Sequence, residues 1–503
     1  MPNPMEDLRQ HLAAVEDLHA ASELLGWDQN TMMPPRGGAA RAESLATLGR
    51  VTHELFVSDE TSRLLEAAEQ ALGDADAGSD DASLLRVTRR HLDKARRVPS
   101  RLQAERARAA SVGQEAWVAA REHSDFSEFA PYLTRNLELA REYVDCFDGF
   151  DCAYDVLLDD FEPGARSRQV TTLFAELRDE LVPLIAQLRE HEGAVRDSCL
   201  HGSFEIGKQR ALARGLVALM GYEPDSWRMD DAVHPFAAGI GGGDVRITSR
   251  WDPSFLGSGI YAAMHECGHG LYEAGVGDEL RRTPLGHGES LGIHESQSRL
   301  WENMVGRGRP FCNVLAPRIG ELFLGSPDGL DPDELYAAVN RVAPSLIRVE
   351  ADEATYGLHV VLRFELEQEL IEGRLAVADL PEAWNSRVQE YFGLRVPDDA
   401  SGALQDVHWA AGLIGYFPTY ALGNLIAGQL WARAHEDLAD LDDHIAAGEL
   451  APLREWLRDR VHRHGAKFRT DELLSQVVGG PIAVAPFVDY LKAKLGAVYG
   501  TSL

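Results

Sequence analysis

Apolar side chains recur every three or four residues through most of the first 190 positions, which is the spacing of amphipathic helices. In the first helix they are Leu8, Leu12, Val15, Leu18, Ala21 and Leu25. We expect this helix to end near Trp27–Asp28, before the proline and glycine pairs of residues 34–38. A second helical run covers 39–71, an acidic loop follows at 74–81, and helical patterns continue to about His191. The N-terminal part of the chain is therefore predicted to be helical.

The hydrophobic period changes after Asp231. Apolar and polar residues alternate from Val245 to Thr248 behind a glycine-rich segment, which predicts a short strand entered by a turn. No Gly-Lys-Ser/Thr sequence follows the glycines, which disfavours a phosphate-binding loop. A strand here either lies along a cleft, where it can pair with an extended peptide, or belongs to an ordinary small sheet. The pattern alone favours neither alternative.

The helical pattern returns between Tyr261 and Gly275, where His265, Glu266 and His269 form an H-E-x-x-H motif. On a helix the two histidines lie ~40° apart and one turn along, so both imidazoles can bind one zinc ion. Glu266 lies ~100° off that face, where it can reach a water on the metal. Cys267 points nearly opposite to His265 and is predicted to pack rather than to bind metal.

By itself, the H-E-x-x-H motif is moderate support for a zinc site. A chain of 503 residues with 18 histidines contains it by chance in roughly one case in twenty, and the alternative is a helix with ordinary core or surface histidines. A zinc held by two histidines needs a third protein ligand and an open position for water. Glu295 follows His269 by 26 residues, on a helix predicted to begin near Ser290. That separation allows a returning antiparallel helix, as in thermolysin-like peptidases with a His₂Glu site.

Two segments further along the chain carry candidate chemistry. Residues 331–334, Asp-Pro-Asp-Glu, mark a helix start. The next predicted helix has a polar face, either a cleft wall or a solvated surface, formed by Arg348, Asp352, Thr355 and His359. An aromatic-rich stretch at 405–420 contains His408 and Tyr420. These two side chains can donate hydrogen bonds to a transition state, although such residues are also common in loop packing.

Composition narrows the class of partner and the compartment. The net charge is −31 and the pI is near 4.9, which argues against nucleic acid and anionic membrane surfaces as partners. Five cysteines without a C-x-x-C pair indicate a reducing compartment and no disulfide framework. No stretch approaches 18 uninterrupted apolar residues, and the first residues do not follow a signal-peptide pattern. A cytoplasmic protein without a membrane anchor is expected.

Together these motifs resemble the carboxypeptidase Taq family of zinc metallocarboxypeptidases. The family's five signatures have counterparts in the same order: His234-Pro235-Phe236, Asp244-x-Arg246-x-Thr248, His265-Glu266-x-x-His269, His294-Glu295-Ser296-Gln297 and Ile347-Arg348-x-x-Ala351-Asp352. The resemblance runs from Trp27–Asp28 to Leu491. One departure is Cys267, where threonine or serine is more frequent.

The resemblance implies a mainly α, elongated metallopeptidase fold with a deep cleft and a small β-sheet beside the H-E-x-x-H helix. It implies one catalytic domain over residues 1–503, with a helical lobe at about 1–200 packed on a metal-site lobe at about 201–503. It further implies a homodimer that uses Zn²⁺ or Co²⁺. Its substrates would be peptides with a free C-terminus, from which single residues are released with broad specificity.

The expected roles follow from chemistry and from the resemblance together. His265, His269 and Glu295 would bind the metal, and Glu266 would act as general base. The oxyanion of the transition state would receive a hydrogen bond from His408 or Tyr420. Arg348, oriented by Asp352, would bind the terminal carboxylate, and the other candidates for substrate binding are His234 and Arg246. Arg246 and Arg299 have weaker claims to the carboxylate, because either can be a structural ion-pair partner.

Two alternatives remain open from sequence. The same His₂Glu site would serve an oligopeptidase that cuts internal bonds of short peptides, and a cationic group that binds a free carboxylate would distinguish the two enzymes. From another class, the chain could be a non-catalytic helical scaffold stabilised by zinc. The presence of Glu266 counts against a scaffold, because a structural zinc site does not need a general base.

Overall fold

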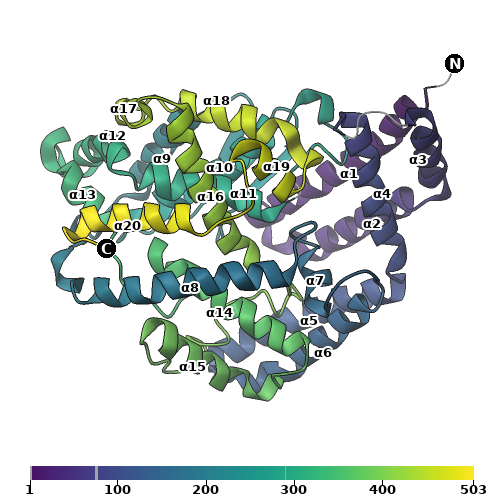
Figure 1. Cartoon of the computed structure of the whole chain (residues 1–503), viewed down its shortest axis with the longest axis horizontal. Helices are drawn as coiled ribbons and strands as arrows, with labels where there is room; N and C mark the ends of the chain where they lie inside the picture. The colour runs from purple at the N-terminus through teal and green to yellow at the C-terminus, as the bar shows by residue number, and fades with distance from the viewer. Residues whose placement is uncertain (1–2, 74–77, 289) are drawn as a thin grey trace.

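The computed structural model describes residues 3–73, 78–288 and 290–503. Helices make up 69% of the chain (Figure 1), and one three-stranded sheet accompanies them. The sheet packs against the helix that carries the H-E-x-x-H motif. The predicted mainly α class, with a small sheet beside that helix, is therefore confirmed. None of the described helices combines the length and the apolar composition needed to cross a membrane.

Eight α-helices lie in the described part of residues 3–189. They are α1 (Pro4–Thr31), α2 (Gly38–Phe56), α3 (Asp59–Leu72), α4 (Asp80–Arg97), α5 (Ser100–His123), α6 (Phe126–Val144), α7 (Ala153–Leu158) and α8 (Ser167–Arg189). The first helix extends past its predicted end to Thr31. The run predicted at 39–71 is two helices, because the Ser58 side chain accepts a hydrogen bond from Thr61 N and caps α3. Of the expected acidic loop, residues 74–77 lie outside the described residues, and Asp80–Asp81 already begin α4.

The sheet follows α9 (Ile206–Met220) and contains β1 (Trp227–Asp231), β2 (Ala237–Gly241) and β3 (Asp244–Ser249). The strand order is β1-β3-β2, with β1 parallel and β2 antiparallel to β3. The strand predicted around Val245 is thus present and lies in the centre of the sheet. Its backbone is paired on both sides, so an extended peptide could join this sheet only at β1 or β2.

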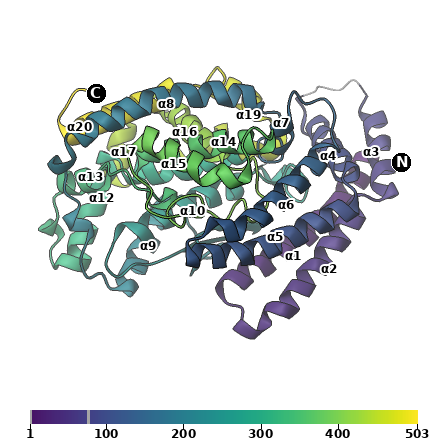
Figure 2. The ribbon, with the colours of Figure 1, turned by 90° about the horizontal axis from the view of Figure 1, so that it is seen from below.

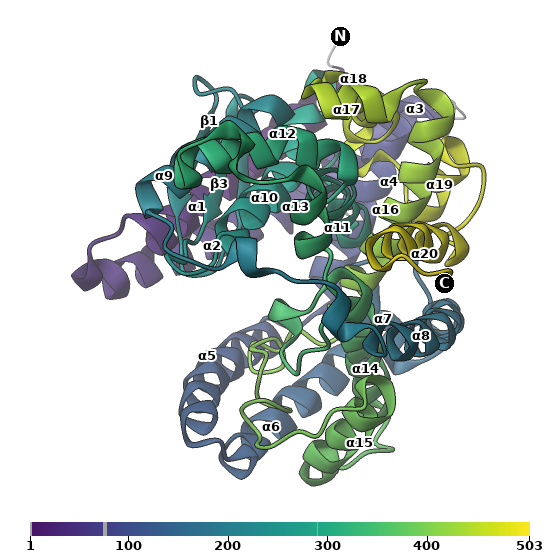
Figure 3. The same ribbon diagram turned by 90° about the vertical axis from the view of Figure 1, so that its left-hand side faces the viewer.

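Eleven α-helices follow the sheet in the described part of the chain. They are α10 (Gly257–Gly275), α11 (Leu291–Arg299), α12 (Arg309–Ile319), α13 (Pro332–Val339), α14 (Glu353–Ile371), α15 (Leu380–Phe392), α16 (Pro418–Asp437), α17 (Leu441–Ala447), α18 (Ala451–Arg460), α19 (Thr470–Val477) and α20 (Ala485–Tyr499), with a π-helix (Leu300–Gly306) directly after α11. In the middle of the molecule, α11 contacts both α10 and α16 (Figures 1 and 3).

Two apolar clusters form the core. The larger one contains buried side chains from Val98 to Tyr499 and includes residues of α6, α8, α10, α11, α14 and α16. The smaller one joins Leu8 of α1 and Leu65 of α3 to Val276 and Leu285, just beyond α10. Figure 2 shows α5 beside α6 and α1 beside α2. The division into two lobes near residue 200 stays a prediction.

The polar face predicted for a helix over 347–359 is wrong. Arg348 lies in a short 3₁₀ turn, and α14 begins only at Glu353. The Asp352 side chain accepts hydrogen bonds from the backbone N–H groups of Ala354 and Thr355, which is the helix-capping role that aspartate favours. Arg348 and Asp352 therefore do not share a helix face. The helix start predicted at Asp331 is present, since Asp331 caps α13.

Candidate active site

The H-E-x-x-H motif lies on α10, and its two histidine rings are 5.0 Å apart. Both side chains are largely buried, each with 18% of its surface exposed. Glu295 comes from α11, whose first turn is capped by the Ser290 hydroxyl accepting from Ile293 N. The helix start predicted near Ser290 is therefore present, and α11 directs Glu295 toward α10.

The Glu295 carboxylate faces the Nε2 atom of each of the two histidines. Its Oε2 atom lies 3.6 Å from His269 Nε2 and 3.9 Å from His265 Nε2, and one ligand atom from each residue falls within 4.8 Å of the others. Over residues 3–73, 78–288 and 290–503, no other three His, Cys, Asp or Glu side chains converge in this way. Two imidazole nitrogens and one carboxylate oxygen form a donor set that suits Zn²⁺ and leaves a coordination position for water.

Glycines allow the helices around this group to approach closely. A Cβ atom on Gly268, between the two histidines, would lie 2.7 Å from Gln297 O of α11, and one on Gly423 of α16 would lie 2.6 Å from Glu295 Cβ. Either contact is shorter than real side chains tolerate. Glycine inside a helix is the sequence signal that could have indicated this packing, because it lowers helix stability and is favoured there only where another backbone must approach closely.

Charged side chains surround the His–His–Glu group. His265 Nδ1 lies 2.9 Å from Glu302 Oε2, in the π-helix, and Arg299 Nε donates to Glu295 Oε1 at 2.7 Å. Burial opposes ionisation of Glu302, but the hydrogen bond with His265 and the charges of Arg299 and Arg307 lower its pKa. With Nδ1 donating to a carboxylate, His265 has its Nε2 lone pair available on the side of Glu295. Arg299 has the structural ion-pair role that the sequence left open.

Glu266 is buried, with 7% of its surface exposed. Its pKa is raised to about 7, mainly by burial; the charge of His265 opposes the rise, and the nearby carboxylates of Glu295 and Glu302 contribute to it. A carboxyl group with a pKa near neutrality can both accept and return a proton at physiological pH. Cys267, its neighbour, is fully buried in the core, as predicted.

Arg348 lies in a second cluster of buried charges. Its Nη2 donates to Asp406 Oδ1 at 2.8 Å, and Arg363 Nε donates to Asp406 Oδ2 at 2.7 Å. Burial opposes ionisation of Asp406, but both guanidinium groups lower its pKa. The predicted orientation of Arg348 by Asp352 is wrong, because Asp352 caps α14 and Asp406 takes its place. Two guanidinium groups share one carboxylate, which leaves one positive charge without a bonded carboxylate among the described residues.

His408 and Tyr420 adjoin this cluster. The Tyr420 hydroxyl lies 3.1 Å from His408 Nε2, and the Tyr420 ring lies 5.0 Å from the Arg348 guanidinium carbon. Burial lowers the pKa of His408 to about 4, with the two arginines lowering it and Asp406 opposing them, so the imidazole is neutral near pH 7. The structure thus brings together Arg348, His408 and Tyr420.

Tyr356, which sequence reasoning missed, connects the two charged clusters. Its hydroxyl accepts a hydrogen bond from Arg348 Nη1 at 2.9 Å. The guanidinium of Arg299, the partner of Glu295, lies 4.1 Å from the centre of its ring. Arg363 and Asp406 were missed in the same way, because residues 348, 363 and 406 meet only in the folded chain.

The remaining two candidates lie around the sheet. Arg246, on β3, donates to both carboxylate oxygens of Asp244 at 2.9 and 2.8 Å, and its guanidinium lies 4.2 Å from the Trp27 ring of α1. His234 is exposed in the segment between β1 and β2. The described contacts of Arg246 are those of a structural ion pair, and the substrate-binding role of both residues stays a prediction.

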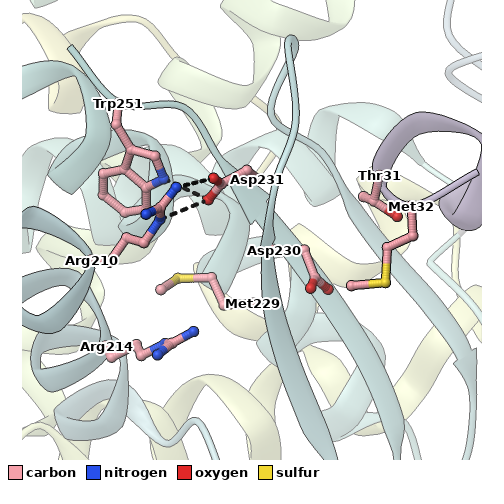
Figure 4. Close-up of a pocket in the computed structure, with 8 residues that line it drawn as sticks. All are labelled: Thr31, Met32, Arg210, Arg214, Met229, Asp230, Asp231 and Trp251. Carbon is pink, nitrogen blue, oxygen red and sulfur yellow. Dashed lines mark hydrogen bonds and ion pairs between the residues drawn. The ribbon is translucent and has the colours of Figure 1, made fainter. Parts of the chain in front are cut away.

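Two pockets lie outside the His–His–Glu group. One, of about 280 Å³, is shown in Figure 4 and is lined by Thr31, Met32, Arg210, Arg214, Met229, Asp230, Asp231 and Trp251. In it, Arg210 and the Trp251 indole N–H both donate to Asp231 (Figure 4). The other, of about 250 Å³, includes Glu273 and His287 in its wall. Neither pocket is lined by any of the three candidate metal ligands.

A buried His–His–Glu group with a glutamate beside the first histidine is the side-chain arrangement of zinc peptidases. The sequence model of the carboxypeptidase Taq (M32) metallopeptidases matches residues 7–495, and the chain belongs to this family. Thermostable carboxypeptidase 1 of Thermus thermophilus is 41% identical over 492 residues, with 96% of each chain covered. Carboxypeptidase 1 of Bacillus subtilis is 35% identical, with 97% of each chain covered.

Solved structures agree with this assignment. The M32 carboxypeptidase from Deinococcus radiodurans R1 superposes with a TM-score of 0.96 at 37% identity, covering 99% of this chain and 100% of that chain. A carboxypeptidase from Pyrococcus furiosus gives 0.94 at 33% identity, covering 98% and 99%. The resemblance inferred from the motifs is confirmed over the whole chain. The protein is a metallocarboxypeptidase, a hydrolase of peptide bonds, and the family implies a divalent metal ion and peptide substrates.

Proposed function

We propose that the protein releases single amino acids from the free C-terminus of peptides, with His265, His269 and Glu295 as metal ligands. The observation that carries this proposal is the buried Arg348–Asp406–Arg363 cluster, whose unbalanced positive charge suits a substrate carboxylate. An enzyme that cuts internal bonds would have no use for a buried cation at this place. The cluster therefore favours the carboxypeptidase over the oligopeptidase.

Each step of the reaction has a side chain to perform it. A bound divalent ion would polarise the scissile carbonyl and lower the pKa of a water molecule. Glu266 accepts the proton of that water and returns it to the leaving amine. Tyr420 donates a hydrogen bond to the developing oxyanion, while His408, neutral at pH 7, holds the Tyr420 hydroxyl in place. Arg348, held by Asp406, binds the terminal carboxylate through two parallel hydrogen bonds.

Zinc is the proposed metal because the donor set is two imidazoles and one carboxylate, and cobalt would suit the same set. Broad specificity for the released residue, a homodimer and a cytoplasmic location remain expectations. The first two derive from the family resemblance and the third from the sequence composition.

One peptide, prepared as the free acid and as the C-terminal amide, tests the proposal. We expect stepwise loss of C-terminal residues from the free acid by mass spectrometry, slow cleavage of the amide, and no cleavage of either after chelation. Activity should return when zinc is added back. Internal fragments, or equal cleavage of the acid and the amide, would instead support the oligopeptidase.

A further inference from the structure

Behind His269, away from Glu295, two more side chains continue a hydrogen-bonded chain. His269 Nδ1 lies 2.7 Å from His294 Nδ1, and His294 Nε2 lies 2.7 Å from Glu273 Oε1. Glu273 is one turn after His269 on α10, and His294 directly precedes Glu295 on α11. The outer oxygen of Glu273 lies 3.0 Å from Nδ1 of His287, which is half exposed. These hydrogen bonds therefore connect a proposed metal ligand, His269, to the protein surface at His287.

The short distance between two Nδ1 atoms fixes where the protons lie. The Nε2 atom of His269 faces Glu295 and must be free of a proton to bind a metal ion, so its single proton is on Nδ1. That proton is donated to His294 Nδ1, which therefore carries none. The proton of His294 is then on Nε2 and is donated to Glu273. This arrangement satisfies both hydrogen bonds and leaves His269 Nε2 without a proton.

The His294 ring is held in this orientation by packing. The Tyr272 ring lies 4.9 Å from it, centre to centre. A Cβ atom on Gly288 would approach His294 Cδ2 to 3.0 Å and Tyr272 Cε1 to 2.5 Å, so the backbone closes directly over the two rings. His294 thus has little room to turn its Nδ1 atom away from His269.

We infer that His294 and Glu273 are positioning residues for the metal ion, acting through His269 as a two-member relay. Glu273 selects the tautomer of His294, and His294 selects the tautomer and the ring orientation of His269. The inference rests on the proposed role of His269 as a ligand. The other histidine is supported differently, since His265 meets the Glu302 carboxylate directly. Partners of this kind are known to contribute to metal affinity.

The test compares two substitutions of one residue in the full-length protein. His294→Phe keeps the ring and removes the acceptor, whereas His294→Asn places a carbonyl oxygen close to the position of Nδ1. Zinc affinity is measured by competition with a chromophoric chelator, and ligand geometry by the visible absorption of the Co²⁺-loaded protein. We expect about 10- to 100-fold weaker zinc binding and an altered cobalt spectrum for His294→Phe, with most of both restored in His294→Asn. His444→Phe, on the surface of α17 beside Glu449, is the matched control and should leave affinity unchanged.

The outcomes separate this inference from the proposal on which it rests. Wild-type affinity in His294→Phe, or equal losses in the phenylalanine and asparagine variants, would overturn the relay. If His294→Phe does not fold, Glu273→Ala replaces it, because His294 then loses the acceptor for its Nε2 proton; unchanged affinity in that variant also overturns the relay. Wild-type affinity in His269→Ala would instead refute the ligand assignment itself.

Discussion

Asp406 accepts two hydrogen bonds from Arg348, one from Nε at 3.1 Å and one from Nη2 at 2.8 Å. Both bonds go to the same oxygen, Oδ1, so the second oxygen remains for Arg363. Because Asp406 holds Nε and Nη2 of Arg348, the remaining N–H groups of the guanidinium point in a fixed direction. Of these, the group on Nη1 donates to the Tyr356 hydroxyl. The pair therefore presents a pre-oriented cation.

Replacing Arg348 tests whether this cation binds the substrate. Arg348→Ala should lose about 2–5 kcal/mol of binding to peptides with a free C-terminus, because a buried charge pair loses one partner. The measurement is kcat/KM on a free-acid peptide and on its amide. We expect a large loss for the acid and little change for the amide. Arg50→Ala, an exposed arginine on α2, is the control, and parallel losses on both peptides in Arg348→Ala would refute a carboxylate-binding role.

Glu266→Gln tests the general base. The amide keeps the size of the side chain but cannot accept a proton, so turnover should fall by at least ~10²-fold. Metal content should stay at the wild-type level, because Glu266 is not a proposed ligand. Elemental analysis and single-turnover kinetics on the same preparation check both points. Wild-type turnover would place the base elsewhere.

Glu295→Ala tests the third ligand. Removing the carboxylate leaves two imidazoles, which are too few for a stable protein zinc site, and it leaves Arg299 without its nearest partner. We expect the variant to lose its metal on dialysis and to be inactive while it still folds. Full metal occupancy after dialysis would exclude Glu295 from the ligand set.

Gly268→Ala tests the close approach of α10 and α11. The added methyl group would meet the backbone at Gln297 and Ser298 at 2.7 Å, and overpacking of this kind costs typically ~1–3 kcal/mol. The melting temperature of the metal-free variant should fall. Gly49→Ala is the matched control, because nothing lies within 4 Å of its added methyl group. There alanine should stabilise α2 by up to ~1 kcal/mol, and equal effects at the two positions would contradict the packing argument.

His462 gives a pH dependence of stability. Its Nε2 lies 2.8 Å from Gln297 Oε1. Burial is the main cause that lowers the pKa of His462 to about 3; the charge of Arg458 acts in the same direction and Glu273 opposes it. In the unfolded chain a histidine has a pKa of about 6.5. The depressed value in the folded state means that stability is fully present above about pH 6.5 and is lost as pH falls toward 3, because only the unfolded chain then gains the proton.

The comparison is between the wild type and His462→Gln, with unfolding free energy measured in urea from pH 7.5 to 4.5. Below pH 6.5 the wild type should lose up to about 1.4 kcal/mol per pH unit more than the variant. Other titrating groups contribute equally to both proteins and cancel in the difference. Parallel curves would show that the folded protein does not lower the pKa of His462, so that the folded and unfolded chains take up this proton at the same pH.

The sequence predicted contacts between residues that are close together in the chain better than contacts between distant ones. His265, Glu266 and His269 follow from one helical period, and Glu295 follows from the room needed for a turn. By contrast, the partner of Arg348 was predicted from its neighbours in sequence and was wrong, since Asp352 caps α14 and Asp406 comes from a segment more than fifty residues later. No local sequence pattern predicts a contact between residues so far apart in the chain.

Two kinds of residue were visible in the sequence without being recognised. Glu273 stands one helical turn after His269, the same spacing as the two histidines, yet spacing does not show that His294 lies between them. The predicted helix over 39–71 was likewise wrong at Ser58, because serine is compatible with a helix in the sequence pattern. In the structure its hydroxyl accepts from a backbone N–H group and begins a new helix. The sequence was sufficient for the fold class and for the convergence of His265, His269 and Glu295, and insufficient for the charged side chains that surround this group.

One helix, α16, touches both halves of the site. Tyr420 lies beside Arg348, and Gly423, three residues on, lies against Glu295; the two positions differ by ~4.5 Å along the helix axis. The spacing between the proposed carboxylate-binding arginine and the proposed metal ligands is therefore set by a rigid element. The proposed release of single residues requires this spacing to match the backbone length of one α-amino acid. A peptide that ends in a β-amino acid, with one additional backbone carbon, would place either its carboxylate or its scissile bond out of register. We expect such peptides to bind and to resist hydrolysis, which would make them inhibitors.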